Sequence, residues 1–300
     1  MDTEHIELAS IDDFVSTYST GKEDVEAYNR TQELVKKGVP IRKIGDLIGR
    51  SYGTVIAWKN NKKRPRAISG LEKCLSLDLL PLDISNHKFP AINILAAKVF
   101  WTGHLSWASN GHQNMSIHGN LQKLEELQNY LQESLDLKTS IRPQRKGKDS
   151  FILSGGTDSA LYARLLQAIG MPPSTADSNQ MPEYVRKLVH SQSVDDSVVR
   201  RALQDFVHVL FEERFYVAHE KHTNRLYLKC FKKEEDARKY GNEVTDLIRV
   251  ALPKLPITED HVKVHATARE SYLPMIYLKV ADMASLSTYY PSLLNESSLS

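Results

Sequence analysis

The sequence predicts an α+β fold in which a small all-α unit is followed by a duplicated αββαββα unit. The 300 residues are 41% hydrophobic and 25% charged, a composition typical of globular chains with room for two domains. Short amphipathic stretches separated by glycines fill residues 21–67 and predict helices. Helices and pairs of strands then recur in one order over residues 91–172 and again over 196–290. This internal repeat predicts two similar halves about a pseudo-twofold axis.

Basic residues are concentrated in one part of the chain, although the formal net charge is only +2. Residues 1–30 contain eight acidic and two basic side chains, whereas residues 31–73 contain eleven basic and three acidic ones. A local basic excess favours a polyanionic partner, and a solvated basic surface is the alternative on charge alone. Residues 1–20 are interpreted as a separate acidic segment.

Three helices are expected within residues 21–67. The first covers Val25–Lys37 and is stopped by Gly38, and the second covers Ile41–Ile48. Ser51 is a good N-cap for the third.

The segment 41–59 closely resembles a helix-turn-helix. Gly45 is small where two helices would cross, and Gly49 lies in the turn. Val55 and Trp58 are three residues apart, so both side chains can face the preceding helices. In such motifs the third helix lies in the major groove of duplex DNA. The side chains not used for packing are the candidate base and phosphate readers: Arg50, Ser51, Tyr52, Thr54, Ala57 and Lys59.

A basic tail follows the third helix, with the sequence Lys59-Asn-Asn-Lys-Lys-Arg-Pro-Arg66. It is expected to contact backbone phosphates, which adds salt-dependent affinity without sequence information. The residues concerned are Lys62, Lys63, Arg64 and Arg66. A helix-turn-helix that makes only protein contacts is the alternative. Residues 68–90 are interpreted as a linker to the duplicated unit.

The duplicated unit is expected to contain the same elements twice. In the first copy they are a helix over 91–101, strands near 104–107 and 114–118, a leucine-rich helix over 121–135, strands near 139–143 and 150–153, and a helix over 161–169. In the second copy they cover 198–211, 215–218, 225–231, 234–252, 261–266 and 275–280, with a last helical piece around Ala284. Residues 291–300 are left as a tail.

This order of elements resembles the LAGLIDADG homing-endonuclease family. Two segments carry the resemblance: Leu95-Ala-Ala-Lys-Val-Phe-Trp-Thr-Gly103 and Val207-His-Val-Leu-Phe-Glu-Glu-Arg-Phe215. The resemblance implies that the first helices of the two repeats pair along the pseudo-dyad, each ending in an acidic residue followed by glycine. In that family the two acids hold divalent metals for phosphodiester cleavage, and two saddle-shaped sheets read the DNA major groove.

Aligned with these motifs, Thr102 and Arg214 stand where the metal-binding acids are expected, and Phe215 replaces the second glycine. A threonine hydroxyl is a poor ligand for a hard cation, and a guanidinium repels it. We therefore expect no catalytic residues, no metal and no cofactor, and a protein that is not an enzyme. Arg214 is expected to contact DNA phosphates in place of the metal. The alternative for Arg214 is a surface side chain paired with Glu212 or Glu213.

Basic residues on the predicted strands or their turns are further candidates for phosphate and major-groove contacts. They are Arg142, Arg145, Lys146, Lys148, Lys221, Arg225, Lys229 and Lys263. Taken singly, each is more often a solvated side chain, and only their clustering on this fold favours DNA contacts.

The whole arrangement resembles DNA-binding regulators of the WhiA type, which combine a degenerate LAGLIDADG domain with a helix-turn-helix, here in reversed order. The resemblance implies a sequence-specific double-stranded DNA-binding protein, either a transcription regulator or a DNA-organising factor. Both a monomer and a homodimer are compatible with it.

Two enzymatic alternatives stay open. A slip in the alignment would make Glu212 or Glu213 the catalytic acid of an active endonuclease. The loop Ser154-Gly-Gly-Thr-Asp-Ser159 matches the loop with which ATP pyrophosphatases hold pyrophosphate at a helix N-terminus. That loop needs a doubly wound sheet, and no apolar strand follows Ile169. A strand-to-helix turn capped by Thr157 or Ser154 is the competing interpretation.

The chain is expected to be cytoplasmic and nucleoid-associated, without membrane contact. The apolar run 91–101 is too short to span a bilayer, and residues 1–20 are acidic where a signal peptide is basic and then apolar. Cys74 and Cys230 lie far apart, which argues against a disulfide framework or a cysteine-built zinc site.

Overall fold

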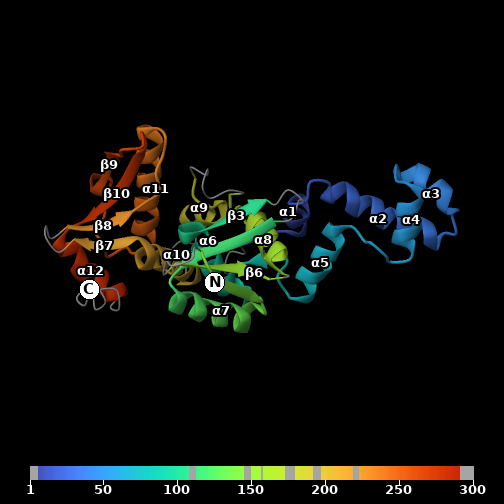
Figure 1. The fold of residues 1–300 in the computed structure, drawn as a ribbon, viewed down its shortest axis with the longest axis horizontal. Coiled ribbons are helices and arrows are strands. Elements are labelled where there is room, and N and C mark those ends of the chain that lie inside the picture. Colours follow the sequence, from blue (N-terminus) through green and yellow to red (C-terminus); the bar gives the residue numbers. More distant parts are fainter. Residues whose placement is uncertain are drawn as a thin grey trace.

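The structure is a computed structural model that describes residues 6–107, 113–144, 150–156, 158–172, 180–191, 197–218 and 223–290. Figure 1 shows an elongated molecule with short helices at one end, a sheet and its helices in the middle, and a second sheet at the other end. The N-terminus lies in the middle region. The chain therefore runs out to the helical end and returns before it builds the two sheets.

The helical end consists of α2 (Gly21–Lys36), α3 (Ile41–Ile48) and α4 (Tyr52–Lys59), which pack against one another. Val55 is fully buried among them, and Trp58 is 5% exposed. The two inward side chains and the order of the three helices agree with the sequence prediction, although α2 begins at Gly21 and not at Val25.

The turn between α3 and α4 depends on residues with special backbone or capping roles. Gly49 ends α3 in the left-handed region, with a φ of 66°. Ser51 caps α4, because its Oγ accepts a hydrogen bond from the backbone N–H of Thr54 at 3.2 Å. A Cβ on Gly45 would lie 2.8 Å from the carbonyl oxygen of Arg50, so the close approach of α3 to the turn requires glycine.

The segments interpreted from sequence as an acidic segment and a linker contain regular structure. Strand β1 (Glu7–Ala9) pairs antiparallel with β2 (Leu82–Asp83), while α1 (Ile11–Ser16) and α5 (Arg66–Ser76) connect the middle region to the helical end. Apolar side chains of β1, α1 and β2 belong to the main hydrophobic core. Strands β1 and β2 and helix α1 are too short to show periodicity in sequence, which is why they were not predicted. The 11-residue α5 was missed although it is longer than α3 and α4. The domain boundaries themselves stay a prediction.

The first copy of the repeat forms the middle region. Its elements are α6 (Phe89–Thr102), β3 (Gly103–Trp107), β4 (Gln113–Gly119), α7 (Leu121–Leu135), β5 (Thr139–Pro143), β6 (Phe151–Gly155) and α8 (Ser159–Ala168). The four strands form one antiparallel sheet in the order β3-β4-β6-β5. Helix α7 packs on this sheet with Leu124, Leu127, Leu131 and Leu135 buried.

The second copy follows after α9 (Glu183–Val189), a helix that the sequence analysis missed. Its elements are α10 (Ser197–Arg214), β7 (Phe215–Ala218), β8 (Thr223–Tyr227), α11 (Glu234–Ala251), the 3₁₀ turn Glu259–His261, β9 (Val262–Ala266), β10 (Tyr272–Leu278) and α12 (Val280–Tyr289). The strand order β7-β8-β10-β9 repeats that of the first sheet. The α+β class and the duplication are therefore confirmed.

Two strands of the second sheet are displaced from their expected positions. Strand β8 ends at Tyr227, whereas the sequence predicts a strand continuing to Phe231, and β10 begins at Tyr272. Phe231 forms only an isolated β-bridge with Tyr272. Its ring packs against that of Tyr240 on α11, with centroids 5.1 Å apart. The apolar character of residue 231 thus reflects core packing and not membership of a strand.

The two first helices, α6 and α10, pack side by side and join the copies. Asn93 donates from Nδ2 to the carbonyl oxygen of Ala202 at 2.8 Å, and Trp101 donates from Nε1 to that of Phe206 at 3.2 Å. These contacts satisfy polar groups that are buried between the helices.

Candidate nucleic-acid interface

The strands of both four-stranded sheets contain no acidic residue over their described ranges. All 37 Asp and Glu residues of the chain therefore lie elsewhere. Successive side chains of a strand point to opposite faces, and the inward set, such as Leu105, Met115 and Ile117, is buried. The outward set contains no carboxylate, so it does not repel a polyanion.

One row of outward side chains crosses the first sheet in register. It contains His104, Ser116, Ser154 and Ser140, on β3, β4, β6 and β5 respectively. Ser116 Oγ lies 3.0 Å from His104 Nδ1, and the hydroxyls of Ser140 and Ser154 are 3.2 Å apart. Hydroxyl groups both donate and accept, so this row can bond base edges or phosphates.

The neighbouring row of the same sheet contains His118 and the exposed Arg142. The rings of His104 and His118 are stacked, with centroids 5.6 Å apart. Burial and the nearby His104 lower the pKa of His118, outweighing a hydrogen bond with Gln144. His118 is therefore neutral at pH 7, and Arg142 supplies a fixed positive charge to this face.

The equivalent row of the second sheet has a different chemistry. Tyr216 on β7 pairs in register with Arg225 on β8, which pairs with Tyr277 on β10. Tyr216 is 56% exposed. The Arg225 guanidinium carbon lies 5.1 Å from the ring centroid of Tyr277, within range of a cation–π contact.

Two predicted phosphate contacts of the second sheet differ in their surroundings. Lys263 is exposed on β9. Lys229 follows β8, and its Nζ lies 5.4 Å from the ring centroid of Phe231 and 5.1 Å from that of Tyr240. The Lys229 ammonium packs against these two buried rings and so points toward the core. Of the two lysines, the exposed Lys263 is therefore better placed to reach a ligand.

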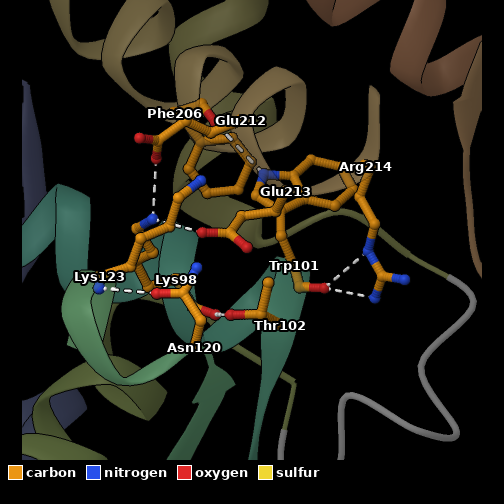
Figure 2. Close-up of polar contacts among 9 residues, drawn as sticks. All are labelled: Lys98, Trp101, Thr102, Asn120, Lys123, Phe206, Glu212, Glu213 and Arg214. Atoms are coloured by element: carbon orange, nitrogen blue, oxygen red, sulfur yellow. Dashed lines mark hydrogen bonds and ion pairs between the residues drawn. The ribbon is translucent and has the colours of Figure 1, made fainter. Parts of the chain in front are cut away.

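An ion-pair cluster lies where the C-terminal ends of α6 and α10 meet (Figure 2). Lys98 Nζ is 2.8 Å from Glu212 Oε2 and 2.6 Å from Glu213 Oε1. The side chains of Lys98, Glu212 and Glu213 are 12%, 31% and 16% exposed. Burial would lower the pKa of Lys98, but the two carboxylates outweigh burial and raise it. Burial likewise opposes the shift at Glu212, whose pKa is lowered mainly by the hydrogen bond and charge of Lys98.

Thr102 and Arg214, the two positions aligned with catalytic acids, bond to backbone carbonyls of α6. Thr102 Oγ1 donates to the carbonyl oxygen of Lys98 at 2.9 Å. Arg214 donates from Nε and Nη2 to the carbonyl oxygen of Trp101, at 3.1 and 2.6 Å (Figure 2). Arg214 thus caps the end of the partner helix, and the adjacent glutamates pair with Lys98. The Arg214 side chain is nevertheless exposed at this end. Its contact with a DNA phosphate stays a prediction.

The junction does not fit the divalent cation that the sequence resemblance implies. Such a cation needs anionic oxygens from more than one direction. Here both carboxylates come from adjacent positions of α10 and share one ammonium, while α6 contributes a hydroxyl engaged with the backbone. Within the described ranges, no group of three His, Cys, Asp or Glu side chains could hold a metal.

The predicted DNA-reading residues of the helical end fall into two groups. Ser51, Tyr52, Lys59, Lys62, Lys63 and Arg66 are exposed, and Thr54 and Ala57 are half-buried beside them. The remaining two are held by acids: Arg50 Nη2 is 2.7 Å from Asp24 Oδ1, and Arg64 Nη1 is 2.7 Å from Glu72 Oε2. A hollow of about 600 Å³ lies along the outer side of α4 and includes Thr54, Lys62 and Lys63.

Four predicted phosphate contacts lie outside the described residues: Arg145, Lys146, Lys148 and Lys221. Thr157, one of the two capping residues proposed for the loop after β6, also lies outside them.

The ATP-pyrophosphatase alternative does not agree with the fold. Strand β6 is antiparallel to both of its neighbours, so the parallel doubly wound sheet that the loop requires is missing from the described region. Asp158 pairs with Lys73, and Ser154 Oγ bonds across the sheet to Ser140. The expected cap by Ser154 is therefore wrong, because that hydroxyl belongs to the outward row of the sheet.

The sequence analysis missed the aromatic row on the second sheet and the serine and histidine row on the first. Among residues of the strands, only basic ones were predicted to contact DNA. The alternation within Phe215–Ala218 and Tyr272–Leu278 places one tyrosine of each strand opposite the core, and this signal was available once the strands had been located.

No protein-family model matches the sequence, and no curated protein matches it. Among solved structures, the chain is similar to the homing endonuclease I-DmoI in complex with DNA and Mn (13% identity, 69% of this chain and 98% of that chain, TM-score 0.39). It is also similar to variants of I-DmoI described as mesophilic (12% identity, 68% and 96%, TM-score 0.40). A third is the homing endonuclease I-WcaI bound to its DNA recognition sequence (11% identity, 73% and 92%, TM-score 0.39).

One expectation from the sequence is corrected by these comparisons. The chain was expected not to be an enzyme, whereas the solved structures that it matches are endonucleases. At identities of 11 to 13% the similarity concerns the fold, so ligands and chemistry have to be argued from this chain's own side chains. In the described part of the chain, no helix has the length and apolar character of a membrane span.

Proposed function

We propose that this protein binds double-stranded DNA. The observation that carries the proposal is the absence of carboxylates from the described strands of the first sheet, whose outward face presents hydroxyls, imidazoles and the cation Arg142. Phosphates dominate the affinity of proteins for DNA, and base-edge hydrogen bonds give specificity. Arg142 and the serine row of the first sheet offer one group of each kind.

We propose that the helical end makes a second contact with the same duplex. Helix α4 presents Tyr52 at 52% exposure, and the tail beyond it presents Lys62 and Lys63. In a helix-turn-helix, α4 would enter the major groove and the tail would follow the backbone. This arrangement supports binding to a preferred sequence, as in a regulator or a DNA-organising factor.

The first test is duplex binding at several salt concentrations, measured by fluorescence anisotropy with a labelled 30-base-pair DNA. We expect Lys62→Ala with Lys63→Ala to weaken all sequences alike and to reduce the slope of log affinity against log salt by about 2, roughly one for each phosphate contact. Lys36→Ala with Lys37→Ala, an equal loss of exposed charge on α2, is the matched control and should change the slope little. An unchanged slope in the tail variant, or an equal change in the control, contradicts the assignment.

The second test separates reading from folding at α4. Selection of bound sites from a random duplex pool should give a preferred sequence that changes in Tyr52→Ala or Thr54→Ala, because their side chains would meet base edges. Trp58→Ala should instead unfold the helical end, because Trp58 packs against Tyr28 in its core with ring centroids 5.8 Å apart. Unchanged site preference in both surface variants would show that α4 does not read bases.

Cleavage of the bound DNA is the second candidate function. It is favoured by the position of Glu212 and Glu213 at the junction of the two first helices, where both carboxylates would have to leave Lys98 to act. Magnesium- or manganese-dependent nicking of a plasmid that carries the selected site is the test. Nicking that disappears in Glu212→Gln or Glu213→Gln, and persists in Glu125→Gln on the exposed face of α7, supports cleavage at the junction. Absence of nicking by the parent protein contradicts it.

A further inference from the structure

The outward face of the second sheet presents aromatic rings beside cations. Tyr216, Arg225 and Tyr277 lie side by side in register on three adjacent strands. On the neighbouring row, Tyr227 pairs with Met275, which pairs with the exposed Lys263 on the edge strand β9. The face therefore presents three tyrosine rings, with Arg225 between two of them and Lys263 at the edge of the sheet.

Tyr277 lies along the sheet and does not project from it. Its hydroxyl is 3.9 Å from the sulfur of Met275, two residues back on the same strand, and 3.0 Å from Nε2 of His265 on β9. Only a side chain lying over residue 275 can reach both groups. The ring is thus fixed before any ligand arrives, which lowers the entropic cost of stacking on it.

Tyr216 is the accessible ring of the patch. It is 56% exposed, and its ring meets that of Tyr227 edge to face, with centroids 6.1 Å apart and an interplanar angle of 73°. Such a contact orients the Tyr216 ring and leaves most of its surface to solvent.

We propose that this face, the aromatic sheet face (Tyr216, Arg225, Tyr227, Lys263 and Tyr277), binds single-stranded nucleic acid, with unpaired bases stacking on Tyr216 and Tyr277. Arg225 and Lys263 would pair with the phosphates between the bases. The patch fits this ligand better than a duplex, because base faces are covered by their neighbours in a duplex and are available only in a single strand. The proposal is independent of duplex binding by α4 and the first sheet.

The charge of the surroundings agrees with this ligand. The described strands β7 to β10 contain no carboxylate, and His265 and Lys263 lie at the edge of the sheet. A positively charged groove with aromatic platforms is the common design of sequence-tolerant single-strand binding. The first sheet has the same acid-free strands and carries His104, Ser116 and Ser154 where the second carries Tyr216, Arg225 and Tyr277.

The test measures binding of a fluorescein-labelled 15-nucleotide oligothymidine and of a 30-base-pair duplex to the full chain. We expect Tyr216→Leu to weaken oligothymidine binding about 5- to 150-fold, the range for loss of one stacked base, and to leave duplex binding within about twofold. Tyr216→Phe keeps the ring and should retain the parent's affinity. Tyr130→Leu on α7, where the tyrosine is 38% exposed, is the matched control and should leave oligothymidine binding unchanged.

A measurement on the unaltered protein makes the test independent of how well the variants fold. Oligothymidine containing 5-iodouracil, photo-crosslinked to the parent protein, should yield adducts at Tyr216 or Tyr277 by mass spectrometry. The proposal is overturned if the parent does not bind oligothymidine, if adducts form only outside the second sheet, or if Tyr216→Leu binds as the parent does. An equal loss in Tyr216→Phe and Tyr216→Leu also overturns it, because the hydroxyl and not the ring would then make the contact. Equal weakening of oligothymidine and duplex would assign the face to DNA in general and overturn the proposal as well.

Discussion

The two sheets have one strand order and two surface chemistries. The row that begins at the second residue of the first strand reads His104, Ser116 and Ser154 in one sheet and Tyr216, Arg225 and Tyr277 in the other. Apolar side chains fill buried inward positions of both, for example Leu105 and Ile117 in the first and Leu226 and Ile276 in the second. Packing therefore constrains one face of each sheet, whereas the outward face was free to diverge after duplication.

The two first helices differ in the same way. Helix α6 contributes the cation Lys98 to their junction, and α10 contributes Glu212 and Glu213. A symmetrical junction would place like charges opposite each other, which is unfavourable in a partly buried site. Because α6 supplies the cation and α10 supplies the carboxylates, the ion pairs hold the two helices together.

The largest expected effect comes from removing the shared cation. Lys98→Met keeps most of the apolar stem of the side chain and leaves two carboxylates close together without the ammonium they share. We expect a loss of about 2 to 3 kcal/mol in the free energy of unfolding, less than the cost of breaking a fully buried pair because Glu212 is 31% exposed. Urea denaturation followed by circular dichroism measures it.

The acid dependence of stability gives a control for this effect. The pKa of Glu212 is lowered in the folded protein, so its contribution is present above its ordinary value of 4.5 and is lost as the pH falls through the lowered value. Lys98→Met should flatten this acid limb, and adding Glu212→Gln and Glu213→Gln should recover most of the stability. A triple variant as unstable as Lys98→Met would show that packing of the lysine stem, and not charge, holds the junction.

An intermediate effect is expected from exchanging the two rows. Placing the second sheet's residues on the first, with His104→Tyr, Ser116→Arg and Ser154→Tyr, should increase the affinity for oligothymidine by roughly tenfold, because one stacked base is worth about 1 to 3 kcal/mol. The same anisotropy titration measures the gain. A variant with Ser116→Arg alone tests charge without rings and should gain much less. Equal gains in the two variants would mean that the difference between the sheets is one of charge.

Much of this fold could be predicted from the sequence because its elements are long and periodic. The leucines of α7 and the repeated helix-strand-strand order located both copies, and Gly49 with Ser51 located the turn between α3 and α4. The three-residue β1 and two-residue β2 were missed, because their pairing joins positions more than seventy residues apart and leaves no local pattern.

The candidate site was harder to predict than the fold. Charge counting identified Lys62, Lys63 and Arg142, which are exposed, but it also selected Arg64 and Lys229, which are held by a carboxylate and by aromatic rings. Partners of this kind depend on tertiary packing. The tyrosine row became visible only with the register of the strands, because its members are separated by many residues in the sequence.

The smallest expected effect is a pH dependence of stability that arises from the stacked pair His104 and His118 of the first sheet. The pKa of His118 is lowered by burial and by His104, so the folded protein takes up this proton less readily than the unfolded chain. Stability should therefore fall as the pH drops below the ordinary value of 6.5 and level off below the lowered value, with no effect above pH 7. His118→Asn should remove this part of the pH dependence, whereas His265→Asn on the second sheet should leave it in place. Thermal unfolding between pH 7.5 and 5 measures both.

Bound duplex should have the opposite effect on the protonation of His118, because phosphates near the histidine pair favour the protonated ring. The parent's duplex affinity should therefore rise on acidification more steeply than that of His118→Asn. Identical pH profiles for parent and His118→Asn, with and without DNA, would show that His118 neither contributes to this pH dependence nor meets phosphate.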